Sequence, residues 1–313
     1  MLEEALLLLI KKCHFDHINN LLKGCLIIEF HMKSEIQSLA KILDTDDKTL
    51  YQIIEKPSSF YRSFPIKRTR KRPRWINAPD PTLKLIQRNI LNKVLYKLTP
   101  HKAAHGFYPN KSIITNASPH CGKNWVYSFD IKDFFPSTKE KIIFETLRFR
   151  SQLTKTESKI ISHLTTLDGE LPQGAPTSPH LANLAFCYLD VELSRIAKEN
   201  SLNYTRYADD MTFSGNKKMQ NLEANITQII KKSGYVLSEK KTKCMGKNSQ
   251  QKVTGLVVND RILLPRTLRR KIRALKHAVR LDGVSNAITH SNLVNSDNEL
   301  RGYLALERML ESV

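Results

Sequence analysis

The sequence predicts an α+β fold in which helices pack around an antiparallel sheet. Two runs of β-prone residues, 202–206 and 211–214, flank a short polar segment and indicate a strand, a tight turn and a second strand. The apolar run 125–129 indicates a further, buried strand. Apolar residues recur at helical spacing over residues 31–54 and 83–98, which indicates amphipathic helices outside the sheet.

The net charge is unusual for a globular protein. The 313 residues include 50 Lys and Arg against 30 Asp and Glu, a formal charge of +20 at pH 7. A field of this sign favours a polyanionic partner, although a basic ribosomal or chromatin-type binding protein would share the composition. The hydrophobic content of 41% is ordinary, and the length suffices for two or three subdomains with cores of their own.

The cysteines and the apolar segments indicate a cytoplasmic protein without a membrane partner. The apolar residues 5–10 form a run far shorter than the roughly 20 residues of a membrane span, and we expect them on the buried face of a helix. The cysteines are scattered without a Cys-x-x-Cys pair, which argues against a zinc site and for a reducing compartment. They are Cys13, Cys25, Cys121, Cys187 and Cys244.

Before the sheet, the chain is predicted to be helical and then strongly basic. Residues 1–55 are expected to form helices, with a capping signal at 44–47. Six of the eight residues 67–74 are basic, and they could form the tip of a two-stranded ribbon that contacts a phosphate backbone or a triphosphate. A solvated loop or a localisation-like basic run is the alternative. The helix over 83–98 has one apolar stripe and serves as scaffold.

Three polar positions follow predicted elements of the central region. Asp130 ends the strand that begins at 124, although an isolated Asp after a strand is usually a helix cap. Residues 171–179 form a Pro- and Gly-containing loop that leads into a helix. In that loop Gly174 permits close backbone approach to a ligand and Gln173 offers both a donor and an acceptor, but an ordinary loop would have the same composition.

The segment Tyr207-Ala208-Asp209-Asp210 is the strongest indication of chemistry. Residues at a turn can direct both side chains to one spot, so Asp209 and Asp210 would create a strongly anionic site. A hard cation such as Mg²⁺ prefers oxygen ligands and leaves part of its coordination shell for substrate phosphates. The alternative is an exposed hairpin tip at which Asp merely favours the turn.

Taken in order, these segments resemble the reverse transcriptase family. Residues 129–136, Phe-Asp-Ile-Lys-Asp-Phe-Phe-Pro, are similar to its first catalytic motif, 171–179 to its Pro-Gln-Gly motif and 207–210 to its Tyr-x-Asp-Asp turn. Residues 233–242 resemble the motif that follows, and the resemblance extends over about residues 55–260. It implies a right-hand polymerase with fingers, an antiparallel-sheet palm and a short helical thumb.

Two further elements resemble the bacterial retron type within that family. Residues 116–120 match its Asn-Ala-x-x-His element, and residues 253–255 match its Val-Thr-Gly element, each at the expected place. A group II intron protein is disfavoured because only about fifty residues follow Asp260. Another stand-alone bacterial reverse transcriptase, of the abortive-infection or diversity-generating type, stays an alternative. So does a catalytically silent RNA-binding scaffold, which intact carboxylates oppose.

The resemblance implies a division into four segments. Residues 1–55 would be an N-terminal helical extension, 56–124 the fingers, 125–260 the palm and 261–313 the thumb. Residues 138–170 would form a fingers insertion within the palm.

The resemblance also implies the catalytic residues. Asp130, Asp209 and Asp210, with Ile131, would hold two Mg²⁺ ions, for which Mn²⁺ could substitute, and Asp130 precedes Asp209 by 79 positions, so two strands of one sheet must meet there. Phe135 would be the gate that excludes a 2′-hydroxyl, with Phe134 as the alternative.

Further residues would bind the nucleotide. Gln173 and Arg74 would contact the incoming deoxynucleoside triphosphate, although the sequence does not select among the basic residues near Arg74. Lys241 would be a proton donor to pyrophosphate, with Lys240 and Lys243 as close alternatives.

Recognition of RNA is implied for a third set of residues. The alternative for Asn116, His120 and the strand at 253–255 is packing at the edge of the palm. The basic helix at 269–280 would follow the template-primer backbone. The expected set is Asn116, His120, Tyr207, Val253, Thr254, Gly255, Arg269, Arg270 and Arg273.

The partners implied by the retron resemblance are a cognate structured non-coding RNA and the RNA-DNA product copied from it. Priming would start from a guanosine 2′-hydroxyl. A retron effector protein and a host ribonuclease H that removes the template are further expected partners, and a role in defence against phage follows from the family alone.

Overall fold

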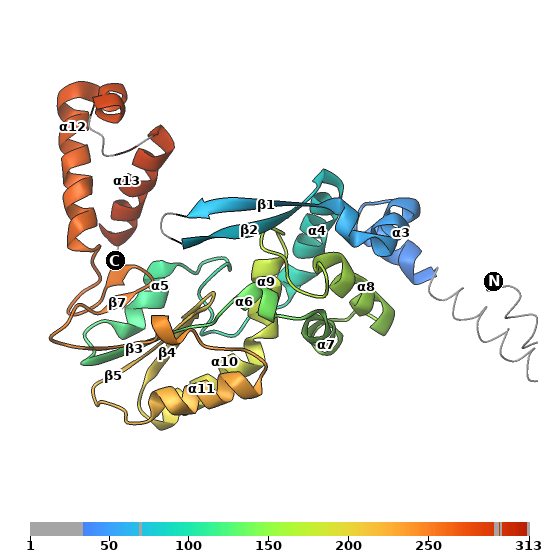
Figure 1. The fold of residues 1–313 in the computed structure, drawn as a ribbon, viewed down its shortest axis with the longest axis horizontal. Coiled ribbons are helices and arrows are strands. Elements are labelled where there is room, and N and C mark those ends of the chain that lie inside the picture. The colour runs from blue at the N-terminus through green and yellow to red at the C-terminus, as the bar shows by residue number, and fades with distance from the viewer. Residues whose placement is uncertain (1–33, 69–70, 291–293, 295, 312–313) are drawn as a thin grey trace, which may run out of the picture. The chain divides into compact units, whose positions relative to one another are not determined.

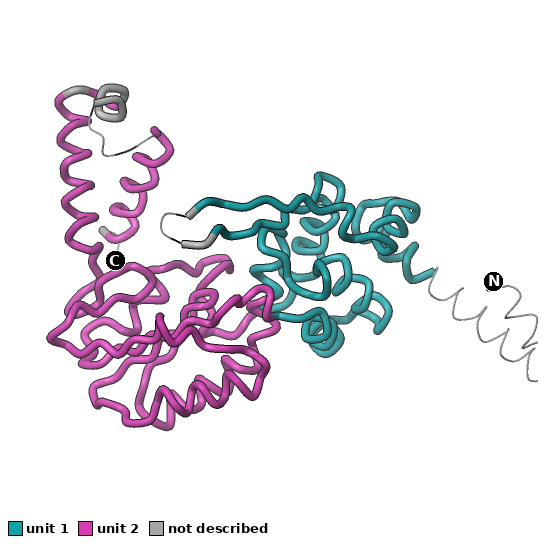
Figure 2. The backbone as a smooth tube through the Cα atoms, in the orientation of Figure 1, with its two compact units in different colours: residues 1–99, 138–181 teal, residues 100–137, 182–313 magenta. Residues whose placement is uncertain are grey.

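The computed structural model describes residues 34–68, 71–290, 294 and 296–311. The chain divides into two compact units, residues 1–99 with 138–181 and residues 100–137 with 182–313 (Figure 2). The helix expected over residues 5–10, Cys13, Cys25 and the ribbon-tip residues 69–70 lie outside the described residues.

The first unit combines a long antiparallel hairpin with several helices (Figure 1). Gln87 joins its parts from a fully buried position, where Nε2 donates to the Tyr61 hydroxyl (2.8 Å) and to the Leu164 carbonyl oxygen (2.9 Å). The capping signal at 44–47 is confirmed, because the Asp46 side chain accepts from the Thr49 N–H. Its elements are α3 (Asp47–Glu55), β1 (Tyr61–Arg68), β2 (Lys71–Pro79), α4 (Pro81–Lys93), α7 (Glu140–Arg150), α8 (Lys155–Thr165) and the start of α9 (Ser178–Ala185).

The second unit is built on a four-stranded antiparallel sheet with the order β4-β5-β3-β6. The strands are β3 (Trp125–Asp130), β4 (Asn203–Tyr207), β5 (Asp210–Gly215) and β6 (Lys243–Gly246). Aromatic rings pack on it, with Phe213 stacked on Tyr204 (centroids 4.6 Å apart) and edge-on to Phe129 (5.8 Å). The predicted α+β class, the buried strand and the strand-turn-strand are therefore confirmed.

Helices and a small hairpin complete the second unit. They are α5 (Ile113–Ala117), α6 (Phe134–Ser137), α10 (Cys187–Glu199), α11 (Leu222–Lys232), β7 (Lys252–Val253), β8 (Leu256–Val257), α12 (Arg266–His290) and α13 (Asp297–Glu311). Helix α12 is interrupted at Gly283, whose φ of 75° is not helical. Helices α12 and α13 are linked by ion pairs from Lys271 to Glu299 (3.5 Å) and from Lys276 to Glu307 (2.8 Å).

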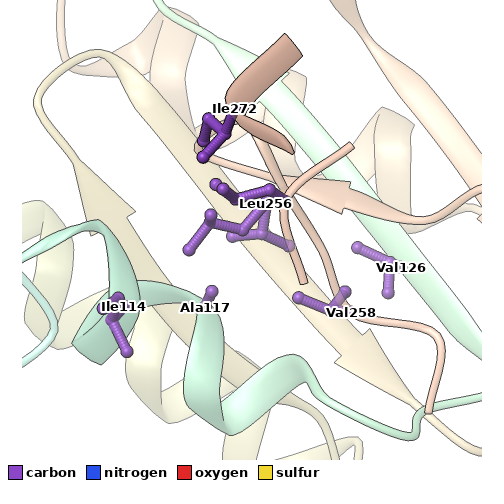
Figure 3. Packing of buried hydrophobic residues seen from close by; sticks show 8 residues of the cluster. Ile114, Ala117, Val126, Leu256, Val258 and Ile272 are labelled. Atoms are coloured by element: carbon purple, nitrogen blue, oxygen red, sulfur yellow. The ribbon is translucent and has the colours of Figure 1, made fainter. Parts of the chain in front are cut away.

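One hydrophobic cluster connects α5, β3, the β7–β8 hairpin and α12 (Figure 3). Its buried members include Ile114, Ala117, Val126, Leu256 and Ile272. Because Val126 lies on the central strand and Ile272 on α12, burial of these side chains positions the basic helix relative to the sheet. No helix in the described part of the chain is long and apolar enough to span a bilayer. The names fingers, palm and thumb, with their boundaries, stay predictions.

Candidate active site

Two strand ends bring the predicted carboxylates together. In the antiparallel pair β3–β5, Asp130 lies directly opposite Asp210, and Tyr207 pairs with Asp210 to close a two-residue loop of Ala208 and Asp209. The Ile131 N–H donates to the Asp209 carbonyl oxygen (3.0 Å) and ties the loop to the end of β3. Asp130 and Asp210, which are 80 positions apart in the sequence, therefore meet at one edge of the sheet.

The loop backbone is held in an uncommon conformation. Ala208 has a φ of 56°, in the left-handed region that a residue other than glycine adopts at a cost of roughly 1–2 kcal/mol. Positive φ at the first loop position matches a tight hairpin turn of the II′ kind. Contacts from the surrounding residues must compensate for this cost, and the contacts of Arg206 described below contribute to that compensation.

The site has excess negative charge. Burial first, and then repulsion by Asp209 and Asp130, raise the pKa of Asp210 to about 6. Lys241 opposes this shift, because its ammonium group attracts the ionised form. A raised carboxylate pKa is typical of a site that is completed by a cation.

Lys241 reaches the deepest carboxylate. Its Nζ donates to both Asp130 oxygens, at 2.8 and 2.7 Å. Burial disfavours the charged lysine, but the hydrogen bond and the attraction of Asp130 outweigh burial and raise the Lys241 pKa above its usual value. Of the three candidate lysines, Lys241 contacts Asp130, whereas Lys240 lies on the same short 3₁₀ helix and Lys243 on β6. The role of Lys241 as proton donor stays a prediction.

The residues fit a hard divalent cation by their chemistry. Asp130, Asp209 and Asp210 offer oxygen donors and more negative charge than one lysine neutralises. Within the described ranges, however, no three acidic, His or Cys side chains are already arranged as ligands of one ion. Both Asp130 oxygens bind Lys241 instead. Ile131, predicted at the metal site, directly follows Asp130 and is buried.

A buried arginine supports the loop from within the unit. Arg206, fully buried at the end of β4, donates to both oxygens of Asp190 (2.9 and 2.6 Å). Its Nη1 donates to the Asn183 side chain and to the Ala208 carbonyl oxygen, each at 2.9 Å. The guanidinium also lies over the Phe186 ring, 4.6 Å from its centroid. Arg206 therefore fixes the carbonyl between Tyr207 and Asp209.

The segment before α5 packs against the same loop. The Arg206 N–H donates to the Ala103 carbonyl, and the His105 N–H donates to the Arg206 carbonyl, each at 2.7 Å. A Cβ at Gly106 would lie 2.9 Å from the Ala208 nitrogen, so only glycine permits this approach. The next residue, Phe107, is 46% exposed and contacts both Phe135 (centroids 6.4 Å apart) and Tyr207 (6.2 Å).

The two adjacent phenylalanines have different surroundings. Phe134 is buried and packs against Phe186 and Tyr235, which is the environment of a core aromatic. Phe135 is half-buried, five positions after Asp130, and its ring contacts the partly exposed Phe107. The geometry favours Phe135 rather than Phe134 as the residue that a substrate could touch.

The predicted nucleotide-binding pair lies in the first unit. Arg74 Nε donates to the Gln173 side-chain oxygen, and the Asn77 N–H donates to the Gln173 carbonyl oxygen (2.8 Å). Gly174 has a φ of 135°, and a Cβ there would meet Asn77 at 2.9 Å. The 171–179 loop therefore packs against β2. Within the basic segment 67–74, Arg74 contacts Gln173.

Two residues predicted to bind RNA are buried. His120 has no exposed surface, and its ring nitrogens lie 2.7 Å from the Ser214 and Thr205 hydroxyl oxygens. Burial lowers the His120 pKa to about 3, so the ring is neutral at physiological pH. Asn116 is equally buried. In this state neither side chain presents a surface to RNA, and the geometry favours the alternative of packing at the sheet edge.

The Val-Thr-Gly element forms the loop between β7 and β8. Thr254 and Gly255 both have positive φ (45° and 84°), as a two-residue hairpin loop of the I′ kind requires. Val253 is buried, and the Thr254 hydroxyl donates to the Ile113 carbonyl (3.2 Å) and accepts from Asn116 (3.4 Å). The two short elements predicted separately are therefore in contact.

The basic helix has the predicted two faces. Ile272 and Leu275 are buried, whereas Arg269, Arg270 and Arg273 are exposed. An exposed arginine face can bind a phosphate backbone without any change in the core.

The supporting residues could not be predicted from the sequence; they are Phe107, Asn183, Asp190 and Arg206. No local pattern marks them, because each acts through partners distant in sequence. A buried Asp within an apolar helical stripe, as at Asp190 beside Leu189 and Leu193, is the one signal that could have been noticed.

The chain is similar to known polymerases. A family model described as reverse transcriptase (RNA-dependent DNA polymerase) matches residues 54–258. The retron Ec86 reverse transcriptase of Escherichia coli is 35% identical over 265 residues, which cover 82% of this chain and 81% of that protein. The retron Mx162 reverse transcriptase of Myxococcus xanthus is 35% identical over 256 residues, 70% of this chain but only 53% of that protein. A Candida albicans telomerase, solved with a fragment of telomeric RNA, has a TM-score of 0.49 at 12% identity over 71% of this chain and 50% of that chain.

Proposed function

The chain belongs to the reverse transcriptases, RNA-directed DNA polymerases with a right-hand fold, and to their bacterial retron type, and we propose that it copies part of a cognate structured non-coding RNA into single-stranded DNA. The observation that carries the proposal is the meeting of Asp130, Asp209 and Asp210 at one sheet edge. Priming from a guanosine 2′-hydroxyl and a role in defence against phage extend the proposal by family membership.

The chemistry follows from the carboxylates and their neighbours. Asp130, Asp209 and Asp210 would hold two Mg²⁺ ions, which supply activation of the attacking hydroxyl and stabilisation of the pyrophosphate. Ala208 and Asp209 form the loop that joins Tyr207 to Asp210. Lys241 stands beside Asp130, where an ammonium group can donate a proton to a departing phosphate. Arg74 and Gln173 are proposed to contact the nucleotide.

Nucleic acid that co-purifies with the protein tests the retron assignment. From the native host, we expect a short DNA joined to RNA through a 2′,5′ linkage, visible as a product that shortens after RNase digestion but retains a branched nucleotide. An Asp209→Asn/Asp210→Asn variant expressed in the same way should carry the RNA without DNA. Linear or absent DNA with the unaltered protein would instead favour another stand-alone bacterial reverse transcriptase.

Replacement of the proposed gate should relax sugar selection. Phe135→Val removes a ring that would clash with a 2′-hydroxyl, so the ratio of ribonucleotide to deoxynucleotide incorporation should rise by about 10–100-fold. Single-nucleotide primer extension with each triphosphate measures this ratio. Phe149→Val, the same change at a side chain that is 77% exposed on α7 in the other unit, is the matched control and should leave the ratio unaltered. An unaltered ratio in Phe135→Val would remove the gate assignment.

A catalytically silent RNA-binding scaffold is the second candidate function. The basic surface of α12 favours RNA binding in either case. Deoxynucleotide incorporation that depends on Mg²⁺ or Mn²⁺ separates the two, because a scaffold would bind the RNA without extending a primer. The retron effector protein and the host ribonuclease H stay expected partners.

A further inference from the structure

Lys241 binds both oxygens of a carboxylate that the proposed function assigns to a divalent cation. Its ammonium nitrogen lies 2.8 and 2.7 Å from the two oxygens of Asp130, and Asp130 is only 5% exposed. A carboxylate whose two oxygens both accept from an ammonium group has few lone pairs left for a metal ion. Cation and lysine must therefore compete for the same oxygens.

The backbone delivers Lys241 to this place. The Ser238 N–H donates to the Asp130 carbonyl (2.8 Å), and the Lys132 N–H donates to the Val236 carbonyl (2.8 Å), so residues 236–238 run along the end of β3. The short 3₁₀ helix Glu239–Lys241 follows at once. The Lys241 backbone is thus fixed beside the carboxylates whether or not its side chain contacts Asp130.

The side chain, in contrast, is free to leave. The Lys241 side chain is 58% exposed, and the four-carbon stem of a lysine is flexible. Rotation of the stem would release Asp130 without disturbing the buried core. The ammonium group would stay within reach of the site, because hydrogen bonds at Val236 and Ser238 hold the preceding backbone beside the end of β3.

From this geometry we infer that Lys241 is an internal counter-ion of the metal-free site, and that loading of a divalent cation displaces its ammonium group from Asp130. The inference rests on the proposed function, since it assigns Asp130 to the cation. In the metal-free protein Lys241 neutralises the most buried carboxylate and keeps it in position. After displacement, the same ammonium group is available to phosphate oxygens of the substrate. Lys241 is therefore a positioning residue before it acts on substrate.

Direct measurement of metal affinity tests the competition without any turnover. The full-length protein, freed of nucleic acid in high salt, is titrated with Mn²⁺ while the free ion is followed by its EPR signal. Lys241→Met removes the competing ammonium group and should tighten Mn²⁺ binding by about 10-fold, a change of about 1.4 kcal/mol. Lys240→Met removes the same charge from an exposed neighbour and should change the affinity by less than about twofold. Lys241→Arg, which keeps a cation, should stay close to the unaltered protein.

The outcomes separate the inference from the proposed function. If Lys241→Met and Lys240→Met bind Mn²⁺ with equal affinity, or Lys241→Met binds it more weakly, the counter-ion role is overturned while the metal site stands. If the unaltered protein binds Mn²⁺ no better than Asp130→Asn, the assignment of Asp130 to the cation fails, and the proposed mechanism fails with it. A thermal melt of each variant verifies that it is folded.

Discussion

Asparagine at both positions 209 and 210 should abolish DNA synthesis and leave RNA binding nearly unchanged. The two substitutions keep the size of the side chains but remove two of the three negative charges that face one another at the sheet edge. Loss of the charges that hold the cations should slow incorporation by about 10³-fold or more, equivalent to about 4 kcal/mol of barrier. Primer extension in Mg²⁺ and in Mn²⁺ measures the rate, and filter binding measures RNA affinity.

A matched substitution gives the control for this result. Asp168→Asn makes the same chemical change at an exposed turn in the other unit, with a φ of 51° that Asn adopts as readily as Asp. It should leave synthesis unaltered. Undiminished synthesis by the double variant would remove Asp209 and Asp210 from the catalytic site.

The charges that are needed for DNA synthesis should also lower the stability of the metal-free protein. Because burial and neighbouring carboxylates raise the Asp210 pKa to about 6, the folded protein favours the protonated side chain. At neutral pH and without metal, the ionised Asp210 therefore disfavours folding, and Asp210→Asn should raise the melting temperature in chelator. The gain should shrink as pH falls from about 6 towards about 4, where both folded and unfolded chains bind the proton. An inactive variant that melts higher cannot owe its inactivity to unfolding; a lower melting temperature would contradict the charge argument.

Contiguous signals explain why the central elements could be predicted from the sequence. The strand ending at Asp130 and the β4–β5 hairpin are short apolar runs next to a polar turn, and residues of one run lie beside one another in the sheet. To predict that Asp130 lies beside Asp210 also requires the order of motifs in a known family. The spacing of the carboxylates alone predicts only that two strands must meet.

The support of the site could not be predicted, because burial overrides local preference there. Arginine side chains are mostly exposed in proteins. Arg206, however, has no exposed surface, since Asp190, Asn183 and the Ala208 carbonyl accept its hydrogen bonds. His120 was expected to help recognise RNA, with packing at the edge of the palm as the alternative, and its ring is enclosed by hydroxyls of β4 and β5. The side chains that contact Arg206 and His120 lie at least 16 positions away in the chain, and only tertiary packing selects them.

Removal of Arg206 should be among the most destabilising single changes in the second unit. Arg206→Met would leave the Asp190 carboxylate fully buried, and among the described residues only the Tyr204 hydroxyl would still donate to it (2.7 Å). Burial opposes the charged guanidinium, but attraction and hydrogen bonding by Asp190 outweigh burial and raise the Arg206 pKa above its usual value, which shows how closely the two charges depend on each other. An unpaired buried charge should lower the free energy of unfolding by about 3–5 kcal/mol, measured by urea denaturation.

A pair of the same chemical kind on α10 provides the comparison. Arg195 and Glu199 also lie 2.6 Å apart, but their side chains are 60% and 55% exposed, so Arg195→Met should cost less than about 0.5 kcal/mol. Arg206→Met/Asp190→Leu removes both buried charges and should recover much of the lost stability, because no charge is then left without a partner. That double variant still lacks the hydrogen bond to the Ala208 carbonyl, so we expect it to be folded yet slower in primer extension. Equal costs for Arg206→Met and Arg195→Met would mean that the buried pair does not hold the catalytic turn, and full activity in the double variant would mean that the turn needs no support from Arg206.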